Sequence, residues 1–288
     1  MWMLRLFRAL SYVPLHWMQR MGVVLGWWVW WLSPTYRRNF KKHVHAAGVD
    51  WQAARASIAA TGQVVAELPW SWFRPHEVLL EPFIQWEGID IFEHAMQAGR
   101  GAIFITPHIG CWELGAQAVA ERFSPQYGPM VVLYRPARKA WLAPLLSLAR
   151  SRPGFSGVPI NMAGIRTLLR TLKTGGIVGL LPDQVPPLGQ GVWAPFFGRS
   201  VYTMTLIGKL AQQTGAPVLL SWCERLGPGQ GFKVVITHLQ APELAHGSAA
   251  SPTQTATALN HALETLIRRV PNQYLWGYAR DKQPRSLE

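Results

Sequence analysis

The sequence predicts an α/β fold, with a mixed, mainly parallel central sheet flanked by helices and an apolar, Trp-rich helix at the N-terminus. Short apolar runs, the length of buried strands, alternate along the chain with amphipathic runs of about 10 to 15 residues, as in parallel sheets. The chain has 288 residues, enough to bury the core of one large domain without disulfide bonds. An unbroken apolar segment, residues 21–32, precedes this alternation.

The N-terminal segment reads MGVVLGWWVWWL over residues 21–32, which is shorter than the stretch of about 20 apolar residues that crosses a bilayer. Tryptophan favours the headgroup region, so we expect residues 1–38 to form a membrane anchor that lies in the interface or re-enters it. A single span and an ordinary buried helix are the alternatives. No small-residue cleavage site of a signal peptide follows the run. Basic residues do follow, and they predict that the rest of the chain is cytoplasmic: Arg37, Arg38, Lys41 and Lys42.

We expect the remaining elements to form one domain, residues 39–288. Caps and helix breakers indicate their bounds. Asp50 can cap a helix over 51–68 that Pro69 ends. Apolar runs predict strands at 101–106, 130–134, 177–181, 217–222 and 232–237. Amphipathic runs predict helices at 90–97, 111–122, 140–150, 164–173, 203–214 and 253–269. The proline- and glycine-rich residues 182–200 are expected to form a long loop, and loops of that length are usually functional.

The balance of charge points to an anionic partner. The chain carries 28 Lys and Arg against 15 Asp and Glu, a formal net charge of +13, although only 15% of its residues are charged. Residues 122–182 hold nine basic and no acidic residues. A membrane leaflet is the first partner this predicts and nucleic acid the second, with chance in a basic proteome as the alternative. Because the Trp cluster is apolar and not interleaved with basic residues, we expect no nucleic-acid partner.

Several chemistries are excluded by missing motifs. The two cysteines, Cys111 and Cys223, are too few for a disulfide scaffold or a Cys-rich zinc site, and we expect buried thiols in a reducing compartment. The chain has no H-E-x-x-H zinc motif, no phosphate-binding G-x-x-x-x-G-K-[ST] loop and no G-x-S-x-G nucleophile elbow. A zinc-protease site, ATP or GTP use and an α/β-hydrolase triad therefore have no support in the sequence.

His108 is the candidate general base. It follows the predicted strand 101–106 directly, and ligands of open α/β sheets bind beyond the carboxyl ends of strands. Pro107 and Gly110 favour a turn that would bring Glu113, in the first helical turn, close enough to pair with the imidazole. A carboxylate there would fix the tautomer of the ring and raise its basicity, and the helix N-terminus could support an oxyanion. The simpler alternative is that His108 is a satisfied structural residue.

The sequence around His108 resembles a known family. HIGCWE at 108–113 is similar to the H-x-x-x-x-[DE] block of the glycerolipid and lipid A acyltransferase superfamily. Its Glu, with the preceding GRGAIFITP, resembles the bacterial late lipid A biosynthesis acyltransferases (lauroyl and myristoyl transferases). The resemblance covers about residues 5–282, and further blocks agree in order: LYRP at 133–136, GLLPDQ at 179–184, PFFG at 195–198 and QYLW at 273–276.

This resemblance implies an enzyme, an acyltransferase that moves a fatty acyl chain from an acyl carrier protein thioester to a hydroxyl of a lipid A precursor, in lipopolysaccharide biosynthesis. It implies work at the cytoplasmic face of the inner membrane, without a metal or prosthetic group. His108 would deprotonate the hydroxyl and Glu113 would orient His108. Arg135 would bind phosphate or the thioester region, and Asp183 and Gln184 would lie in or beside the same pocket. Alternatively, Arg135 is only a surface charge and Asp183 only caps the loop.

Other functions stay open beside this one. Where members of the family often carry a His-Arg-Arg-type stretch, this chain has residues 277–282, GYARDK. The same catalytic pair would serve a phospholipid or aminolipid O-acyltransferase. A peripheral membrane protein that binds lipid without turnover is the second alternative. Glycerol-phosphate acyltransferases are less similar, because they usually carry Asp at position 113 and a P-E-G block where this chain has P-D-Q.

Overall fold

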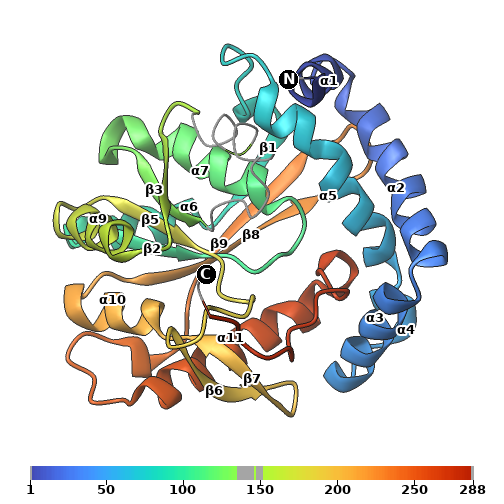
Figure 1. Ribbon diagram of the computed structural model, residues 1–288. Helices are drawn as coiled ribbons and strands as arrows, with labels where there is room; N and C mark the ends of the chain where they lie inside the picture. Colours follow the sequence, from blue (N-terminus) through green and yellow to red (C-terminus); the bar gives the residue numbers. More distant parts are fainter. Residues whose placement is uncertain (1, 135–145, 147–151, 287–288) are drawn as a thin grey trace.

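The protein is described here by a computed structural model that covers residues 2–134, 146 and 152–286 (Figure 1). A seven-stranded sheet lies at the centre, in the order β1-β9-β8-β2-β5-β3-β4. Its neighbouring strands are parallel, with the exception of the antiparallel pair β8–β9, so the predicted mixed, mainly parallel sheet is confirmed. The strands are β1 (Ile84–Glu87), β2 (Ala102–Ile105), β3 (Met130–Tyr134), β4 (Phe155–Pro159), β5 (Ile177–Leu180), β8 (Val218–Arg225) and β9 (Phe232–His238).

Helices cover both faces of the sheet, because successive side chains of a strand point to opposite sides. Phe104 of β2 packs into one core with the helices α6 and α7, whereas its neighbours Ile103 and Ile105 join the other core with α9, α10 and α11 (Figure 1). The predicted flanking helices are therefore confirmed. Their bounds are α6 (Ile89–Gln97), α7 (Trp112–Tyr127), α9 (Met162–Lys173), α10 (Leu206–Thr214) and α11 (Pro252–Arg269).

The N-terminal helices form one side of the molecule (Figure 1). Helix α2 lies against α5 at very short range, because a Cβ on Gly62 would come within 2.1 Å of the Gly22 carbonyl oxygen. A buried ion pair between Glu67 of α5 and Arg225 of β8 ties these helices to the sheet. The helices are α1 (Trp2–Leu10), α2 (Leu15–Leu32), α3 (Pro34–Ala47), α4 (Trp51–Ala54) and α5 (Ala56–Phe73).

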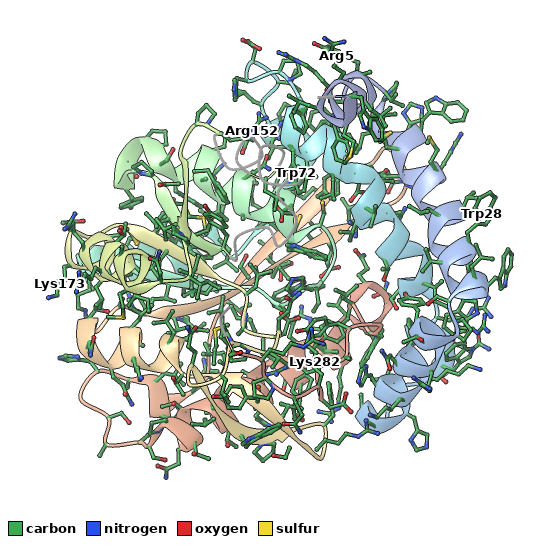
Figure 2. The ribbon with its side chains drawn as sticks, in the orientation of Figure 1. Arg5, Trp28, Trp72, Arg152, Lys173 and Lys282 are labelled. Carbon is green, nitrogen blue, oxygen red and sulfur yellow. The ribbon has the colours of Figure 1, made fainter. Side chains whose placement is uncertain are left out.

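The face of α2 that points away from α5 is apolar and exposed. Figure 2 shows Trp28 directed away from the body of the molecule. Within the described residues, no helix combines the length and the apolar character needed to cross a bilayer. The boundary expected at residue 38 falls inside α3, and the anchoring role of the segment stays a prediction. The exposed apolar side chains of this face are Val24, Leu25, Trp28, Val29, Trp31 and Leu32.

Some predicted elements were wrong in their bounds. Pro69 lies inside α5 instead of ending it, since proline removes a single backbone donor, and the carbonyl that this donor would serve belongs to the exposed Val65. The loop expected at 182–200 contains the strand β6 (Gly191–Phe196), which pairs antiparallel with β7 (Arg199–Met204). The predicted helix at 203–214 therefore begins only at Leu206, in α10. The strands β1 and β4 were not predicted, and the helix expected at 140–150 falls almost entirely outside the described residues.

Candidate active site

His108 and Asp183 come together because they follow neighbouring strands. Strands β2 and β5 are adjacent and parallel, with Ile105 opposite Leu180, so the loops after them leave the sheet at the same edge. His108 lies in the loop after β2 and Asp183 in the loop after β5, and both side chains are buried. The carboxyl edge of a parallel sheet is where ligands of α/β proteins bind, as expected for His108.

The two residues form a fixed pair. The Nδ1 atom of His108 lies 2.7 Å from Oδ1 of Asp183, and the backbone N–H of His108 donates to Oδ2 of the same carboxylate at 2.8 Å. On the other side of the ring, Nε2 of Gln184 lies 2.9 Å from Nε2 of His108. A carboxylate only accepts and an amide NH₂ only donates, so the proton of neutral His108 is on Nδ1 and the lone pair is on Nε2. This is the tautomer of a general base.

The charge of Asp183 is maintained despite its burial. Burial alone would raise the pKa of the carboxyl group, but the positive charge of His108 when it is protonated, its hydrogen bonds and the more distant Arg280 guanidinium lower the pKa below its ordinary value of 3.8. Asp183 is therefore ionised at neutral pH. An ionised carboxylate at Nδ1 holds the ring in place and stabilises the imidazolium that forms when Nε2 takes up a proton.

Glu113 does not pair with His108, because both ring nitrogens have other partners. Its carboxylate lies in the first turn of α7 and accepts a hydrogen bond from the indole Nε1 of Trp72 at 3.3 Å. The turn before α7 is fixed by Gly110, whose φ is +60° and where a Cβ would lie 1.9 Å from the Cys223 carbonyl oxygen. The expected His108–Glu113 hydrogen bond is thus corrected to His108–Asp183, while a catalytic role of Glu113 stays a prediction. Arg135 lies outside the described residues.

The C-terminal segment is hydrogen-bonded to the site, a role that was not predicted from the sequence. The backbone N–H of Leu275 donates to the His108 carbonyl at 3.1 Å. The Tyr278 hydroxyl accepts from the N–H of Val185, next to Gln184, at 3.1 Å. The QYLW block at 273–276 was the available signal, since it was noticed as a motif without a chemical function.

An apolar cavity lies beside the pair, between α7 and the sheet. It is narrow, and only about 30 Å³ of it can hold the centre of a water molecule. Thr106, Trp112 and Leu181, close neighbours of His108 and Asp183 along the chain, line it. Its lining also includes Ala116, Met130 and Gly179. The Trp112 ring also contacts the His108 ring edge-to-face, with centroids 4.6 Å apart. Its lining is mostly apolar, so the cavity suits methylene groups better than polar groups.

The two cysteines of the chain are poor nucleophiles in this state. Cys111 and Cys223 are free and buried, as expected, and burial raises the pKa of both thiols, that of Cys223 to about 12. Neither thiol is a ready nucleophile at neutral pH. Within the described residues no group of three or more His, Cys, Asp and Glu side chains is placed to hold a metal ion.

A buried imidazole held between a carboxylate and an amide, beside an apolar cavity, is typical of enzymes that use acid–base chemistry on a hydrophobic substrate. The chain belongs to the family described as bacterial lipid A biosynthesis acyltransferase, which it matches over residues 2–282. The resemblance inferred from the ordered motifs is thereby confirmed, and the chain is an acyltransferase of this family.

Individual relatives are distant but match most of the chain. It is similar to the lipid A biosynthesis palmitoleoyltransferase of Escherichia coli, with 26% identity over 239 residues, 83% of this chain and 74% of that protein. The lipid A biosynthesis acyltransferase of Haemophilus influenzae is 23% identical over 273 residues, 93% of this chain and 82% of that protein. A phosphatidylinositol mannoside acyltransferase of Mycobacterium tuberculosis is 26% identical over 170 residues, 58% of this chain and 51% of that protein.

Proposed function

We propose that this protein transfers a fatty acyl chain from an acyl carrier protein thioester to a hydroxyl of a lipid A precursor, with His108 as general base. The observation that carries the proposal is the His108–Asp183 pair, 2.7 Å between Nδ1 and Oδ1, beside an apolar cavity. Family membership supports acyl transfer, and the pair supplies the base that attack by a hydroxyl requires.

The proposed reaction proceeds in two proton transfers. Nε2 of His108 takes the proton of the acceptor hydroxyl while its oxygen attacks the thioester carbonyl carbon and forms a tetrahedral intermediate. The carbon–sulfur bond then breaks, and the leaving thiolate takes the proton from the imidazolium to give a free thiol and an ester. Because Gln184 donates to Nε2 in this structure, the acceptor hydroxyl must displace that amide before it can lose its proton.

The other predicted site residues have supporting roles in this proposal. Asp183 orients His108 and stabilises its protonated form. Glu113, whose carboxylate accepts a hydrogen bond from Trp72 at the start of α7, would be a second carboxylate of this site. Arg135, outside the described residues, would bind a phosphate or the thioester region, for which a guanidinium is suited by its fork of donors.

The proposed location is the cytoplasmic face of the inner membrane. The exposed tryptophans of α2 suit the headgroup region, and the basic residues of the neighbouring α3 suit an anionic leaflet. An acidic carrier protein and a phosphorylated lipid are both anionic, so a net charge of +13 favours encounters with either.

A second acceptor class is the alternative, because one set of relatives is named for acylation of phosphatidylinositol mannoside. In that case the same base and cavity would acylate a phospholipid, an aminolipid or a glycolipid. A lipid-binding protein without turnover would keep the fold but not the reaction.

The test is acyl transfer from radiolabelled acyl carrier protein thioesters to a tetra-acylated lipid A precursor carrying its sugar acid, with a lysophospholipid in parallel. We expect label in the lipid A precursor with the wild type and none with His108→Ala. Label in the lysophospholipid alone would show that the acceptor is a phospholipid and not a lipid A precursor. Full activity of His108→Ala would exclude His108 as the base. No transfer to any acceptor would favour the lipid-binding alternative.

A further inference from the structure

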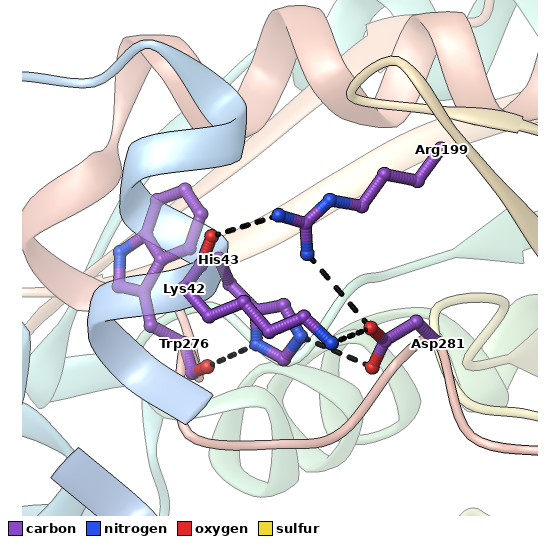
Figure 3. A network of polar contacts seen from close by, with 5 residues as sticks. All are labelled: Lys42, His43, Arg199, Trp276 and Asp281. Carbon is purple, nitrogen blue, oxygen red and sulfur yellow. Dashed lines mark hydrogen bonds and ion pairs between the residues drawn. The ribbon is translucent and has the colours of Figure 1, made fainter. Parts of the chain in front are cut away.

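A second cavity lies away from the apolar one, where three parts of the chain meet. It is narrow, and only about 20 Å³ of it can hold the centre of a water molecule. Helix α3 forms one wall, the β6–β7 hairpin another, and the C-terminal segment 274–281 the third (Figure 3). Its apolar surface is largely aromatic: Phe196, Phe197, Tyr274, Trp276 and Tyr278.

Positive charge exceeds negative charge around this cavity. Asp281 is the carboxylate of its lining. The ammonium group of Lys42 contacts that carboxylate, and Arg199 Nη1 lies 3.8 Å from it (Figure 3). His43 lies between them, with Nε2 3.5 Å from Asp281 and Nδ1 2.9 Å from the Trp276 carbonyl oxygen. Arg280 adds a further positive charge to the lining, and it interacts over a longer distance with the carboxylate of Asp183.

Two guanidinium donors of this lining are buried without an acceptor. Arg280 is 3% exposed and donates from its two terminal nitrogens to the Tyr202 carbonyl at 2.6 Å and to the Thr203 hydroxyl at 2.9 Å. Its Nε atom and the Nη1 atom of Arg199 have no hydrogen-bond acceptor in the described part of the chain. A buried donor without an acceptor is unfavourable, so an anion that reached either nitrogen would be stabilised by it.

We infer that this cavity binds a phosphate group of the lipid acceptor, with Arg199 and Arg280 as its ligands and the aromatic wall against the attached sugar or chain. The inference rests on the proposed function, since it concerns the acceptor of that reaction. Guanidinium groups match the oxygens of phosphate in geometry and charge. In the free protein Asp281 takes part of this positive charge, and the phosphate would compete with that carboxylate.

The position of the cavity favours the lipid as the source of the phosphate. Helix α3, which supplies Lys42 and His43, follows directly on α2, whose exposed tryptophans are proposed to meet the membrane. The C-terminal wall is also bonded to the active site, through Leu275 to the His108 carbonyl and through Tyr278 to Val185. The C-terminal segment therefore forms a wall of the cavity and is also hydrogen-bonded to the loops that carry His108 and Gln184.

The experiment measures binding without an acyl donor, so that no turnover occurs. The full chain in detergent is titrated calorimetrically with a diacylated glucosamine 1-phosphate, with the same lipid lacking its phosphate, and with phosphopantetheine. We expect the phosphorylated lipid to bind about tenfold or more tightly than its dephosphorylated form, as one or two charge-assisted hydrogen bonds provide. Arg199→Gln should abolish this difference.

Two further variants separate a ligand role from a structural one. Asp281→Asn removes the competing carboxylate and should tighten binding of the phosphorylated lipid, which damage to the fold would not do. Arg166→Gln changes the net charge as Arg199→Gln does, at an exposed position on α9, and should leave affinity unchanged. Arg280→Lys keeps the charge but removes the fork, and should weaken binding.

Each contrary outcome is distinct. Equal affinity for both lipids, or equal effects of Arg199→Gln and Arg166→Gln, would overturn the site. Phosphopantetheine binding with the same variant pattern, without discrimination between the lipids, would overturn the lipid as the source. Failure of the acyl-transfer assay with intact phosphate discrimination would reject the proposed function and leave the phosphate site standing.

Discussion

At the scale of single residues, His108 is held from both sides of its ring and through its backbone. Asp183 accepts from Nδ1 and from the backbone N–H, and Gln184 contacts Nε2. A ring fixed in this way keeps one tautomer and one orientation, and neither depends on the substrate. Orientation by Asp183 is therefore expected to matter most in the transition state, when the ring becomes positive.

Asp183→Asn tests this orientation. The amide keeps the shape of the side chain but removes the charge that stabilises the imidazolium, and it can present an NH₂ group to Nδ1. We expect kcat to fall by roughly 10² to 10⁴, with KM within about threefold of the wild-type value. Steady-state acyl transfer checks this, and Gln184→Glu serves as a control that adds a charge at the opposite nitrogen. A rise in KM with kcat unchanged would instead assign Asp183 to substrate binding.

The same substitution has a signature in stability. Because the pKa of folded Asp183 lies below 3.8, the ionised carboxylate stabilises the fold above that pH, and this contribution is lost as the pH falls through the folded-state pKa. Wild type and Asp183→Asn should therefore converge in unfolding free energy on acidification, which denaturant titrations at pH 7 and below pH 4 would measure.

Residue identity could be predicted at this site, but its pairing could not. His108, Asp183 and Gln184 all belong to sequence blocks, yet Asp183 is 75 positions from His108. Glu113 is only five positions away, which made it the expected partner. The pairing depends on β2 and β5 being neighbours in the sheet, and strand order is decided by long-range packing.

At the scale of elements, the apolar cavity depends on small residues of α7 and β5. A Cβ on Gly179 would lie 2.5 Å from the Met130 methyl group, so β5 carries no side chain there, and Ala116 of α7 lines the same space. The depth left by these small residues would limit the length of the acyl chain.

Ala116→Leu should shorten the preferred chain. The larger side chain fills part of the cavity, and each methylene excluded costs about 1 to 3 kcal/mol of discrimination. We expect kcat/KM for the longest accepted donor to fall at least tenfold, while a donor shorter by about two to four carbons is affected less. Ala163→Leu, an exposed position on α9, is the matched control. A uniform loss across chain lengths would show that Ala116 does not limit chain length.

Elements were predictable where periodicity and caps agree. The strand at 130–134 has the predicted bounds and β2, β5 and α11 nearly so, because their apolar runs are flanked by clear turns or caps. The β6–β7 hairpin was predicted as a loop, because the proline and glycine content of the segment outweighed the alternation of apolar and polar residues. Its turn is made by Phe197 and Gly198, both with positive φ, a two-residue turn that only pairing of the two strands makes favourable.

At the scale of the whole molecule, apolar and basic surfaces lie next to each other along the N-terminal helices. Trp28 and Trp31 of α2 are 59% and 64% exposed. The basic residues of α3 follow immediately in the chain, and the net charge is +13. An anionic membrane would attract this side over several ångströms and then bury its tryptophans, which orients the phosphate-binding cavity and His108 relative to the lipid.

The double substitution Trp28→Ser, Trp31→Ser separates the two contributions. Burial of a large apolar side chain provides about 1.5 to 3 kcal/mol, so we expect at least tenfold weaker partitioning into vesicles containing anionic lipid, measured by flotation. The difference between the double variant and the wild type should persist at high salt. Salt should weaken the vesicle binding of both proteins, because it screens their basic residues. Trp193→Ser, on the exposed side of β6 and 41% exposed, controls for tryptophan removal as such. Unchanged flotation of the double variant would show that α2 does not face the membrane. The position of the second cavity would then no longer favour a lipid as the source of its phosphate.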